Sequence, residues 1–264
     1  MSVRAKKRFG QNFLNNIHVI DKILKAADLQ PGEQVMEIGP GLGALTDRLL
    51  QAEVELCAVE VDTDLISMLQ ERNHPRLQVV QGDVLKLDWN GLVPTTPCKL
   101  VANLPYNISS QVLFKILDHR AMFSRMILMF QKEVGDRLLA SSGNRDYGIL
   151  SVLMQTWYEV RRVVQVGPGS FSPPPKVDSV VLQFLPLPET RFTIDNEEVY
   201  RKLVRGAFTQ RRKTLRNSLL ASGWTAAVID EMLHNLRIDP RRRGETLQLE
   251  EFAQMSQFLT HHKS

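Results

Sequence analysis

Asn103-Leu104-Pro105-Tyr106 is the segment of this sequence whose residue types are best suited to chemistry. The exocyclic amine of a nucleic-acid base is a poor nucleophile, because its lone pair is delocalised into the ring. The side-chain oxygen of Asn103 and the backbone carbonyl of Leu104 can accept its two hydrogens and favour a tetrahedral nitrogen. Pro105 restricts the conformation of Leu104, and Tyr106 offers a flat face on which a base can stack. The alternative is an extended turn with Tyr106 in the core.

A glycine-rich segment, Glu37–Gly43, lies between an expected strand and an expected helix. Glycine permits positive φ and a close approach of a ligand, and the helix N-terminus offers free N–H groups. Glu60 lies about 20 residues beyond Gly39, a spacing typical of a carboxylate that binds ribose hydroxyls. The glycine spacing resembles the loop of S-adenosylmethionine-dependent methyltransferases, but Gly39, Gly41 and Ala44 also fit the NAD fingerprint. A tight turn that needs glycine for structural reasons is the third interpretation.

Two further segments fit a site for a nucleotide and a base. Asp83 follows Gly82 after an expected strand and can accept a hydrogen bond from an adenine amino group, although aspartate is also common in turns and caps. Phe171 precedes three prolines, Pro173–Pro175, which can hold its ring outward to stack on a base opposite Tyr106. The alternative is that Phe171 fills the core beneath a rigid hairpin loop.

The elements that would position these residues alternate between strand and helix. Strands are expected at 34–38, 54–59, 77–80 and 99–102, and helices at 17–27, 44–50, 64–71 and 110–117. This alternation predicts an α/β fold with a mainly parallel sheet and helices on both faces. Apolar runs at 125–130, 160–166 and 177–184 would complete the sheet, the last two as a hairpin-like pair. The chemistry-bearing residues would then share the carboxyl edge of the sheet, where ligands bind in such folds.

A second part of the chain begins after a linker, Leu185-Pro186-Leu187-Pro188. We predict a catalytic domain at 1–188 and a small, basic, all-α domain at 189–264. The net charge is only +4, but eleven Lys or Arg and three Asp or Glu lie between Arg201 and Arg243. This asymmetry favours a polyanionic partner. Ala207–Arg216 is expected to be a basic helix lying along an RNA backbone, although most charged helix faces are simply solvated.

Composition narrows the class of protein. With 264 residues, 43% of them hydrophobic and 23% charged, the chain suits one large or two modest domains and is not a disordered chain. Its two cysteines exclude a disulfide framework, and no apolar run reaches the length of a membrane span or a signal-peptide core. A cytoplasmic protein is therefore expected. The six histidines show no convincing spacing for a metal site.

Together these segments resemble the ribosomal RNA adenine dimethyltransferase family over essentially the whole chain. Lys7–Leu14 is similar to the N-terminal signature of that family, which lies over the cofactor, and the other segments follow in the family's order. More narrowly, the chain resembles the bacterial branch that dimethylates two adjacent adenosines near the 3′ end of small-subunit (16S) rRNA. The resemblance implies a Rossmann-like class I methyltransferase sheet, S-adenosylmethionine as cofactor and rRNA in an immature 30S subunit as substrate. It also implies a monomer with no membrane partner.

The resemblance also implies roles for individual residues. S-adenosylmethionine would be bound by seven of them: Asn12, Leu14, Gly39, Gly41, Glu60, Asp83 and Asn103. Within this set Glu60 would hold the ribose and Asp83 the adenine, while Asn103 would contact both the cofactor and the reaction centre.

The catalytic set would be Asn103, Leu104, Pro105, Tyr106 and Phe171, and RNA would be bound by Arg205, Arg211, Arg212, Lys213 and Arg216. A non-catalytic RNA-binding assembly factor is a further interpretation, against which the intact catalytic segment argues. Two alternative enzymes stay open. One is a large-subunit rRNA adenine dimethyltransferase of the antibiotic-resistance type, which has the same chemistry. The other is an NAD-dependent oxidoreductase, in which Asn103–Tyr106 would have no obvious purpose.

Overall fold

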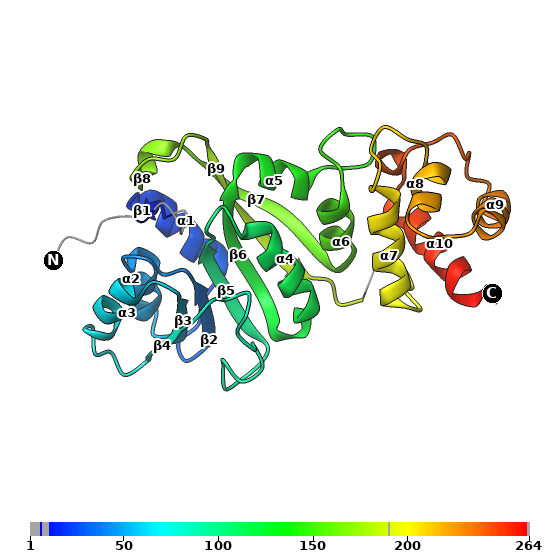
Figure 1. The fold of residues 1–264 in the computed structure, drawn as a ribbon. Coiled ribbons are helices and arrows are strands. Elements are labelled where there is room, and N and C mark those ends of the chain that lie inside the picture. The colour runs from blue at the N-terminus through cyan, green and yellow to red at the C-terminus, as the bar shows by residue number, and fades with distance from the viewer. Residues whose placement is uncertain (1–5, 7–10, 190, 263–264) are drawn as a thin grey trace. The chain divides into compact units, whose positions relative to one another are not determined.

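The computed structural model describes residues 6, 11–189 and 191–262. The chain divides into two compact units, shown as a ribbon in Figure 1, and each is described by itself. Unit 1 comprises Met1–Gly135 and Glu159–Pro186, and unit 2 comprises Asp136–Tyr158 and Leu187–Ser264. Unit 2 therefore includes a segment from well before the linker, which a single boundary after residue 188 does not anticipate. That boundary stays a prediction, and residues 7–10 of the N-terminal signature lie outside the described residues.

Unit 1 is built on a seven-stranded sheet in the order β4-β3-β2-β5-β6-β9-β7 (Figure 1). Its strands, in sheet order, are Leu77–Gln81, Glu55–Glu60, Gln34–Ile38, Cys98–Asn103, Phe123–Gln131, Ser179–Pro186 and Tyr158–Val166. The first five pair in parallel, and β9 runs antiparallel to β6. The expected mainly parallel sheet, completed by two later strands, is confirmed. The chain runs from β2 outward to β3 and β4 and then returns to β5 on the other side of β2, so the loop after β2 lies at the switch point where ligands bind in open α/β sheets.

The sheet of unit 1 is flanked by the helices α1 (Ile17–Ala27), α2 (Ala44–Gln51), α3 (Thr63–Gln70) and α4 (Ser109–Asp118), with a 3₁₀ turn η2 at Arg120–Met122. A further helix, α5 (Lys132–Leu139), begins in unit 1 and ends in unit 2. Strands β2, β5 and β6 beneath them are mostly apolar and largely buried, as expected where helices cover both faces of a sheet. Val35, Leu100 and Val101 are fully buried. Asn16 caps α1 by accepting hydrogen bonds from the backbone N–H groups of His18 and Val19.

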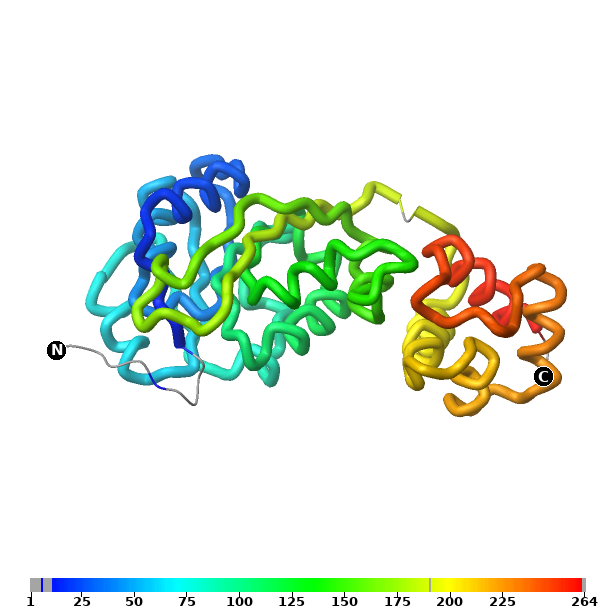
Figure 2. The backbone as a smooth tube through the Cα atoms, turned by 90° about the horizontal axis from the view of Figure 1, so that it is seen from above, coloured from blue at the N-terminus to red at the C-terminus, as the bar shows by residue number. Residues whose placement is uncertain are grey.

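Two short strands that are far apart in the sequence pair in unit 1. β1 (Phe13–Leu14) runs antiparallel to β8 (Phe171–Ser172), with Leu14 opposite Phe171. In Figure 2 the blue N-terminal segment accordingly lies beside the yellow-green loop that carries β8. A 3₁₀ turn, η3 (Pro168–Ser170), leads into β8.

This pairing corrects the expectation that prolines hold Phe171 outward. Its side chain is 3% exposed and belongs to the core cluster that also contains Leu14 and Ile127. The inward position follows from the ladder, because Phe171 faces the buried Leu14 across it. The core-filling alternative is what the structure shows.

Unit 2 contains α6 (Ile149–Trp157), α7 (Glu197–Ala207), α8 (Leu215–Ala221), α9 (Ala226–Asn235), α10 (Leu249–His261) and a 3₁₀ turn η4 (Gly244–Thr246). The expectation of one basic helix over Ala207–Arg216 is wrong, since α7 ends where that range begins. Thr214 caps α8 through its side chain, which accepts a hydrogen bond from Asn217 N, and Leu215 N donates to the carbonyl of Arg242 at 2.6 Å. Among the described residues, no helix has the length and apolar character needed to cross a membrane.

Candidate active site

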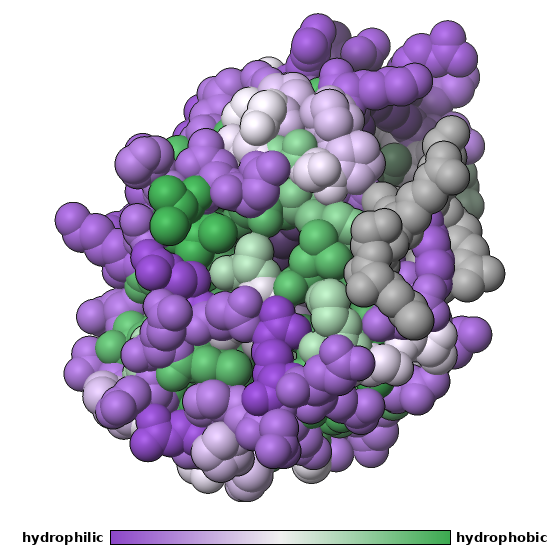
Figure 3. All heavy atoms as spheres, turned by 90° about the vertical axis from the view of Figure 1, so that its left-hand side faces the viewer, coloured by the Kyte–Doolittle hydropathy of each residue, from purple (hydrophilic) through white to green (hydrophobic). Residues whose placement is uncertain are grey.

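One cavity of about 240 Å³ in unit 1 collects the residues that the sequence singled out. Its lining includes the seven residues predicted to bind the cofactor, together with Leu104, Pro105 and Tyr106. Phe171 is not among the described residues that line it. Figure 3 shows the end of unit 1 where β1, α2 and α3 lie, with hydrophobic side chains gathered inside a hydrophilic rim. Leu42 and Val61, two of the exposed hydrophobic residues, also line the cavity.

The loop between β2 and α2 owes its shape to glycines with positive φ. Gly41 has a φ of 59° and Gly43 a φ of 88°. A Cβ on Gly41 would lie 2.9 Å from Cδ1 of Phe13, and one on Gly43 would lie 2.2 Å from Nη2 of Arg72. That Nη2 atom donates to the carbonyl of Leu42 at 2.9 Å, so Arg72 fixes the loop on which the cofactor would rest. Glycine is therefore required by backbone and neighbours together.

Glu60 ends β3 with a side chain that is 6% exposed. Its Oε1 accepts hydrogen bonds from the backbone N–H groups of Val61 and Asp62 at 2.8 and 2.9 Å, and its Oε2 accepts one from Gly41 at 3.3 Å. Burial raises the pKa of Glu60, and these three N–H groups act against that rise. Because each carboxylate oxygen has two lone pairs, Oε1 is filled by its two donors and Oε2 keeps one acceptor position for a ribose hydroxyl.

Two other carboxyl groups line the same cavity. Glu37 is 1% exposed and accepts a hydrogen bond from the hydroxyl of Thr46 at 2.7 Å. Burial raises the pKa of Glu37 to about 8 despite that bond. Asp83 accepts a hydrogen bond from Leu85 N at 3.0 Å, so it shapes its own turn and also faces the cavity.

Asn103 stands at the end of β5, and its side-chain amide is oriented by the N-terminal segment. Its Nδ2 donates to the backbone carbonyl of Asn12 at 3.0 Å. Because the N–H side of the amide is turned towards Asn12, Oδ1 is the atom left to accept a hydrogen bond from a substrate. The hydroxyl of Tyr106, which lines the same cavity, lies 2.6 Å from Oγ of Ser179 on β9, and this contact fixes the ring. Burial raises the pKa of Tyr106, so its hydroxyl is neutral near pH 7.

Sequence reasoning missed two residues that shape the site. Arg72 contacts Leu42, which lies 30 positions earlier, and Asp62 contacts Lys6, which lies 56 positions earlier. The place of Asp62 immediately before α3 is a signal for a helix cap, and the side chain does cap that helix by accepting from Asp64 N. Nothing in the local sequence points to the partners of either residue across the fold.

The predicted RNA-binding residues differ in their surroundings. Arg205 is exposed near the end of α7, and Arg211, Arg212 and Lys213 are exposed in the turn before α8. Arg216 instead makes a two-point ion pair with Asp230, at 2.6 and 2.8 Å. Its charge is therefore largely neutralised within unit 2.

The model of one protein family matches almost all of this sequence. That family is ribosomal RNA adenine dimethylase, and the match spans residues 2–261. The chain belongs to this family. Among curated relatives of this dimethylase, "Ribosomal RNA small subunit methyltransferase A" of Syntrophotalea carbinolica is 55% identical over 99% of each chain. The protein of the same name from Geobacter metallireducens is 48% identical, over 97% of this chain and 96% of that one.

Solved structures show the same fold for the dimethylase. A dimethyladenosine transferase from Plasmodium falciparum superposes with a TM-score of 0.78 at 30% identity, over 92% of this chain and 95% of that one. The 23S rRNA methyltransferase ErmE superposes with a TM-score of 0.70 at 26% identity, over 95% of this chain and 100% of that one. The expected Rossmann-like methyltransferase sheet is thereby confirmed.

Proposed function

We propose that this dimethylase transfers methyl groups from S-adenosylmethionine to N6 of two adjacent adenosines near the 3′ end of small-subunit (16S) rRNA. The observation that carries the proposal is that Asn103–Tyr106 and the glycine loop line one cavity. The relatives at 55% and 48% identity are named for the small subunit, whereas the 23S enzyme is 26% identical. The large-subunit alternative is therefore less well supported. The comparisons give no support to the NAD-dependent alternative, in which Asn103–Tyr106 would have no purpose.

The residues of the cavity fit S-adenosylmethionine. Glu60 is a buried carboxyl group whose Oε2 keeps one acceptor position, suited to a ribose hydroxyl, and Asp83 at the next strand end is suited to the adenine amine. The backbone of the loop around Gly39 and Gly41 would lie against the methionine part, where a Cβ on Gly41 would already collide with Phe13. When bound, S-adenosylmethionine supplies an electrophilic methyl group on a sulfonium whose thioether is the leaving group.

The chemistry required of the chain is to present the adenine amine to that methyl group. Asn103 Oδ1 accepts one N–H of the amine, and the carbonyl of Leu104 accepts the other, so the nitrogen lone pair is directed out of the ring plane. The proton that the alkylated nitrogen then carries is released to water. Tyr106 holds the base by stacking, with its ring fixed through Ser179. The carbonyl of Asn12 binds Nδ2 of Asn103 and so orients the amide before the substrate binds. The acceptor oxygen is therefore already in position for the reaction.

The substrate proposed here is a polyanion, and unit 2 offers a basic surface for it. We infer that Arg205, Arg211, Arg212 and Lys213 contact phosphates of rRNA in an immature 30S subunit, because all four side chains are exposed. Arg216 contributes less than these four, since Asp230 already binds its guanidinium. One chain carries both the cavity and this surface, so we infer that the enzyme acts as a monomer.

The Asn103→Ala variant tests the proposal. Loss of the amide acceptor should lower kcat for methylation of rRNA by at least about 100-fold, the usual cost of removing one preorganised hydrogen-bond group. Binding of S-adenosylhomocysteine, followed by calorimetry, should weaken far less. Asn90→Ala, which changes an exposed asparagine that is not part of the cavity lining, is the matched control. Wild-type kcat in Asn103→Ala would refute the assigned chemistry, and tight binding of NADH by the wild type would favour the oxidoreductase.

A further inference from the structure

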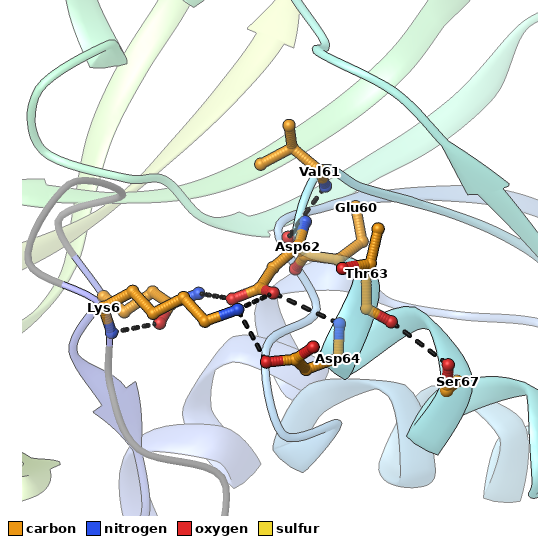
Figure 4. Close-up of polar contacts among 8 residues, drawn as sticks. Lys6, Glu60, Val61, Asp62, Thr63, Asp64 and Ser67 are labelled. Atoms are coloured by element: carbon orange, nitrogen blue, oxygen red, sulfur yellow. Dashed lines mark hydrogen bonds and ion pairs between the residues drawn. The ribbon is translucent and has the colours of Figure 1, made fainter.

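Asp62 is a buried carboxylate that joins three parts of unit 1 (Figure 4). It lies two positions after Glu60, and it is 1% exposed. Its Oδ1 accepts hydrogen bonds from Nζ of Lys6 at 2.5 Å and from the backbone N–H of Asp64 at 3.2 Å. Its Oδ2 accepts one from Nε2 of Gln11 at 2.9 Å. Two of these donors, Lys6 and Gln11, belong to the N-terminal segment. Both donate to the Asp62 carboxylate, close in the chain to Glu60, the proposed ribose-binding residue.

Residues Gln11–Leu14, here called the N-terminal arm, all line the cavity. The arm is held at both of its ends. Leu14 at its far end pairs with Phe171 in the β1–β8 ladder, and Gln11 at its near end is bound by Asp62. Between these ends the ring of Phe13 lies against Gly41 of the glycine loop. The arm thus reaches from β8 to the end of β3 along the cavity wall.

The middle of the arm touches the reacting end of the site. The carbonyl oxygen of Asn12, the residue after Gln11, accepts the hydrogen bond from Nδ2 of Asn103. A displacement of the arm at Gln11 would move this carbonyl and release the amide, which could then present N–H groups instead of Oδ1 to the substrate amine. If Nδ2 of Asn103 took the place of Oδ1, its N–H groups would repel the N–H of the substrate amine. The orientation of the Asn103 amide therefore decides whether the amine is activated.

We propose that Asp62 is a positioning residue of the methyl-transfer reaction: by binding Gln11 and Lys6 it holds the N-terminal arm so that Asn12 orients the Asn103 amide over the cofactor. This inference rests on the function proposed above. Burial would raise the pKa of Asp62, but the bonds from Lys6 and Gln11 outweigh it and hold that pKa below its ordinary value. Asp62 is therefore ionised at neutral pH and binds both donors as a charged acceptor.

The Asp62→Asn variant is the direct test, because asparagine caps a helix as well as aspartate does and α3 should be kept. The expected result is a fall in kcat of at least about fivefold, together with a rise in KM for S-adenosylmethionine and in Kd for S-adenosylhomocysteine of about threefold or more. Hydrogen exchange in peptides that cover Gln11–Leu14 should also become faster. A residue with only a structural role would reduce the active fraction and leave KM and Kd unchanged.

Asp64→Asn is the matched control, since Asp64 also pairs with Lys6, at 2.7 Å, but its side chain is 61% exposed. An exposed ion pair contributes little, so this variant should stay within about twofold of wild type in every measurement. If Asp62→Asn equals Asp64→Asn in kcat, KM, Kd and exchange, the inference is overturned. If the wild type fails to methylate rRNA, the proposed function fails instead, and Kd and exchange still decide the role of Asp62.

Discussion

Glu37 should make the stability of unit 1 fall as the pH rises, and Glu37→Gln should remove that dependence. The carboxyl is 1% exposed, and burial raises its pKa from 4.5 to about 8. Between these two values the folded protein keeps a proton that the unfolded chain has released, so folding is favoured at low pH and loses this contribution as the pH approaches 8. At 1.36 kcal/mol per pKa unit, the full effect is roughly 5 kcal/mol as an upper limit.

Glutamine is close in size to a protonated glutamate and can still accept the Thr46 hydrogen bond through its oxygen. The variant should therefore match wild type at pH 5 and exceed it in unfolding free energy by several kcal/mol at pH 9. Urea unfolding between pH 5 and pH 9, read by hydrogen exchange in peptides from β2, measures this in unit 1 itself. Glu71→Gln, which removes an exposed carboxylate of the same unit, is the control. A difference between variant and wild type that stays constant across this range would refute the reasoning.

Two further substitutions test the loop and the basic surface. In Gly43→Ala the new Cβ would lie 2.2 Å from Nη2 of Arg72, at a residue whose φ is 88°. We expect the free energy of unfolding in urea to fall by about 2 kcal/mol. A second substitution, Arg72→Ala, should recover only the part of this loss that is due to the steric clash. Full recovery would show that the positive φ carries no strain. Arg211→Ala should weaken rRNA binding in filter assays and make it less dependent on salt, whereas Arg216→Ala, which breaks the pair with Asp230, should mainly lower thermal stability. Equal effects of the two on binding would contradict the assignment.

The sheet could be predicted from the sequence because its strands are local patterns. Gln34–Ile38 is predicted as a short buried strand between Pro31-Gly32 and the glycine loop, and both its limits agree with β2. The helix expected at 44–50 differs from α2 by a single residue. The carboxyl ends of parallel strands lie at the same edge of the sheet. Residues that follow these strands, such as Gly39, Glu60 and Asn103, could therefore be assigned to one edge from the sequence.

Features that depend on distant partners could not be predicted in this way. Phe171 is buried because β8 pairs with β1, more than 150 positions earlier in the chain, and a proline-rich loop gives no sign of that partner. The break before α8 depends on Thr214 and on a bond from Leu215 to Arg242, whereas the local pattern of Ala207–Arg216 favours a continuous helix. The roles of the cavity residues stay predictions, although the structure brings their side chains together.

We propose that the enzyme dimethylates two neighbouring adenosines of small-subunit rRNA in this cavity. The most direct measurement incubates the protein with S-adenosylmethionine and unmethylated immature 30S subunits, then maps modified nucleotides of the 16S rRNA by mass spectrometry. The expected result is N6,N6-dimethyladenosine at two adjacent positions near the 3′ end, with no modification of large-subunit rRNA treated alongside. Dimethyladenosine in the large-subunit rRNA alone, or no methylated adenine in either, would contradict it.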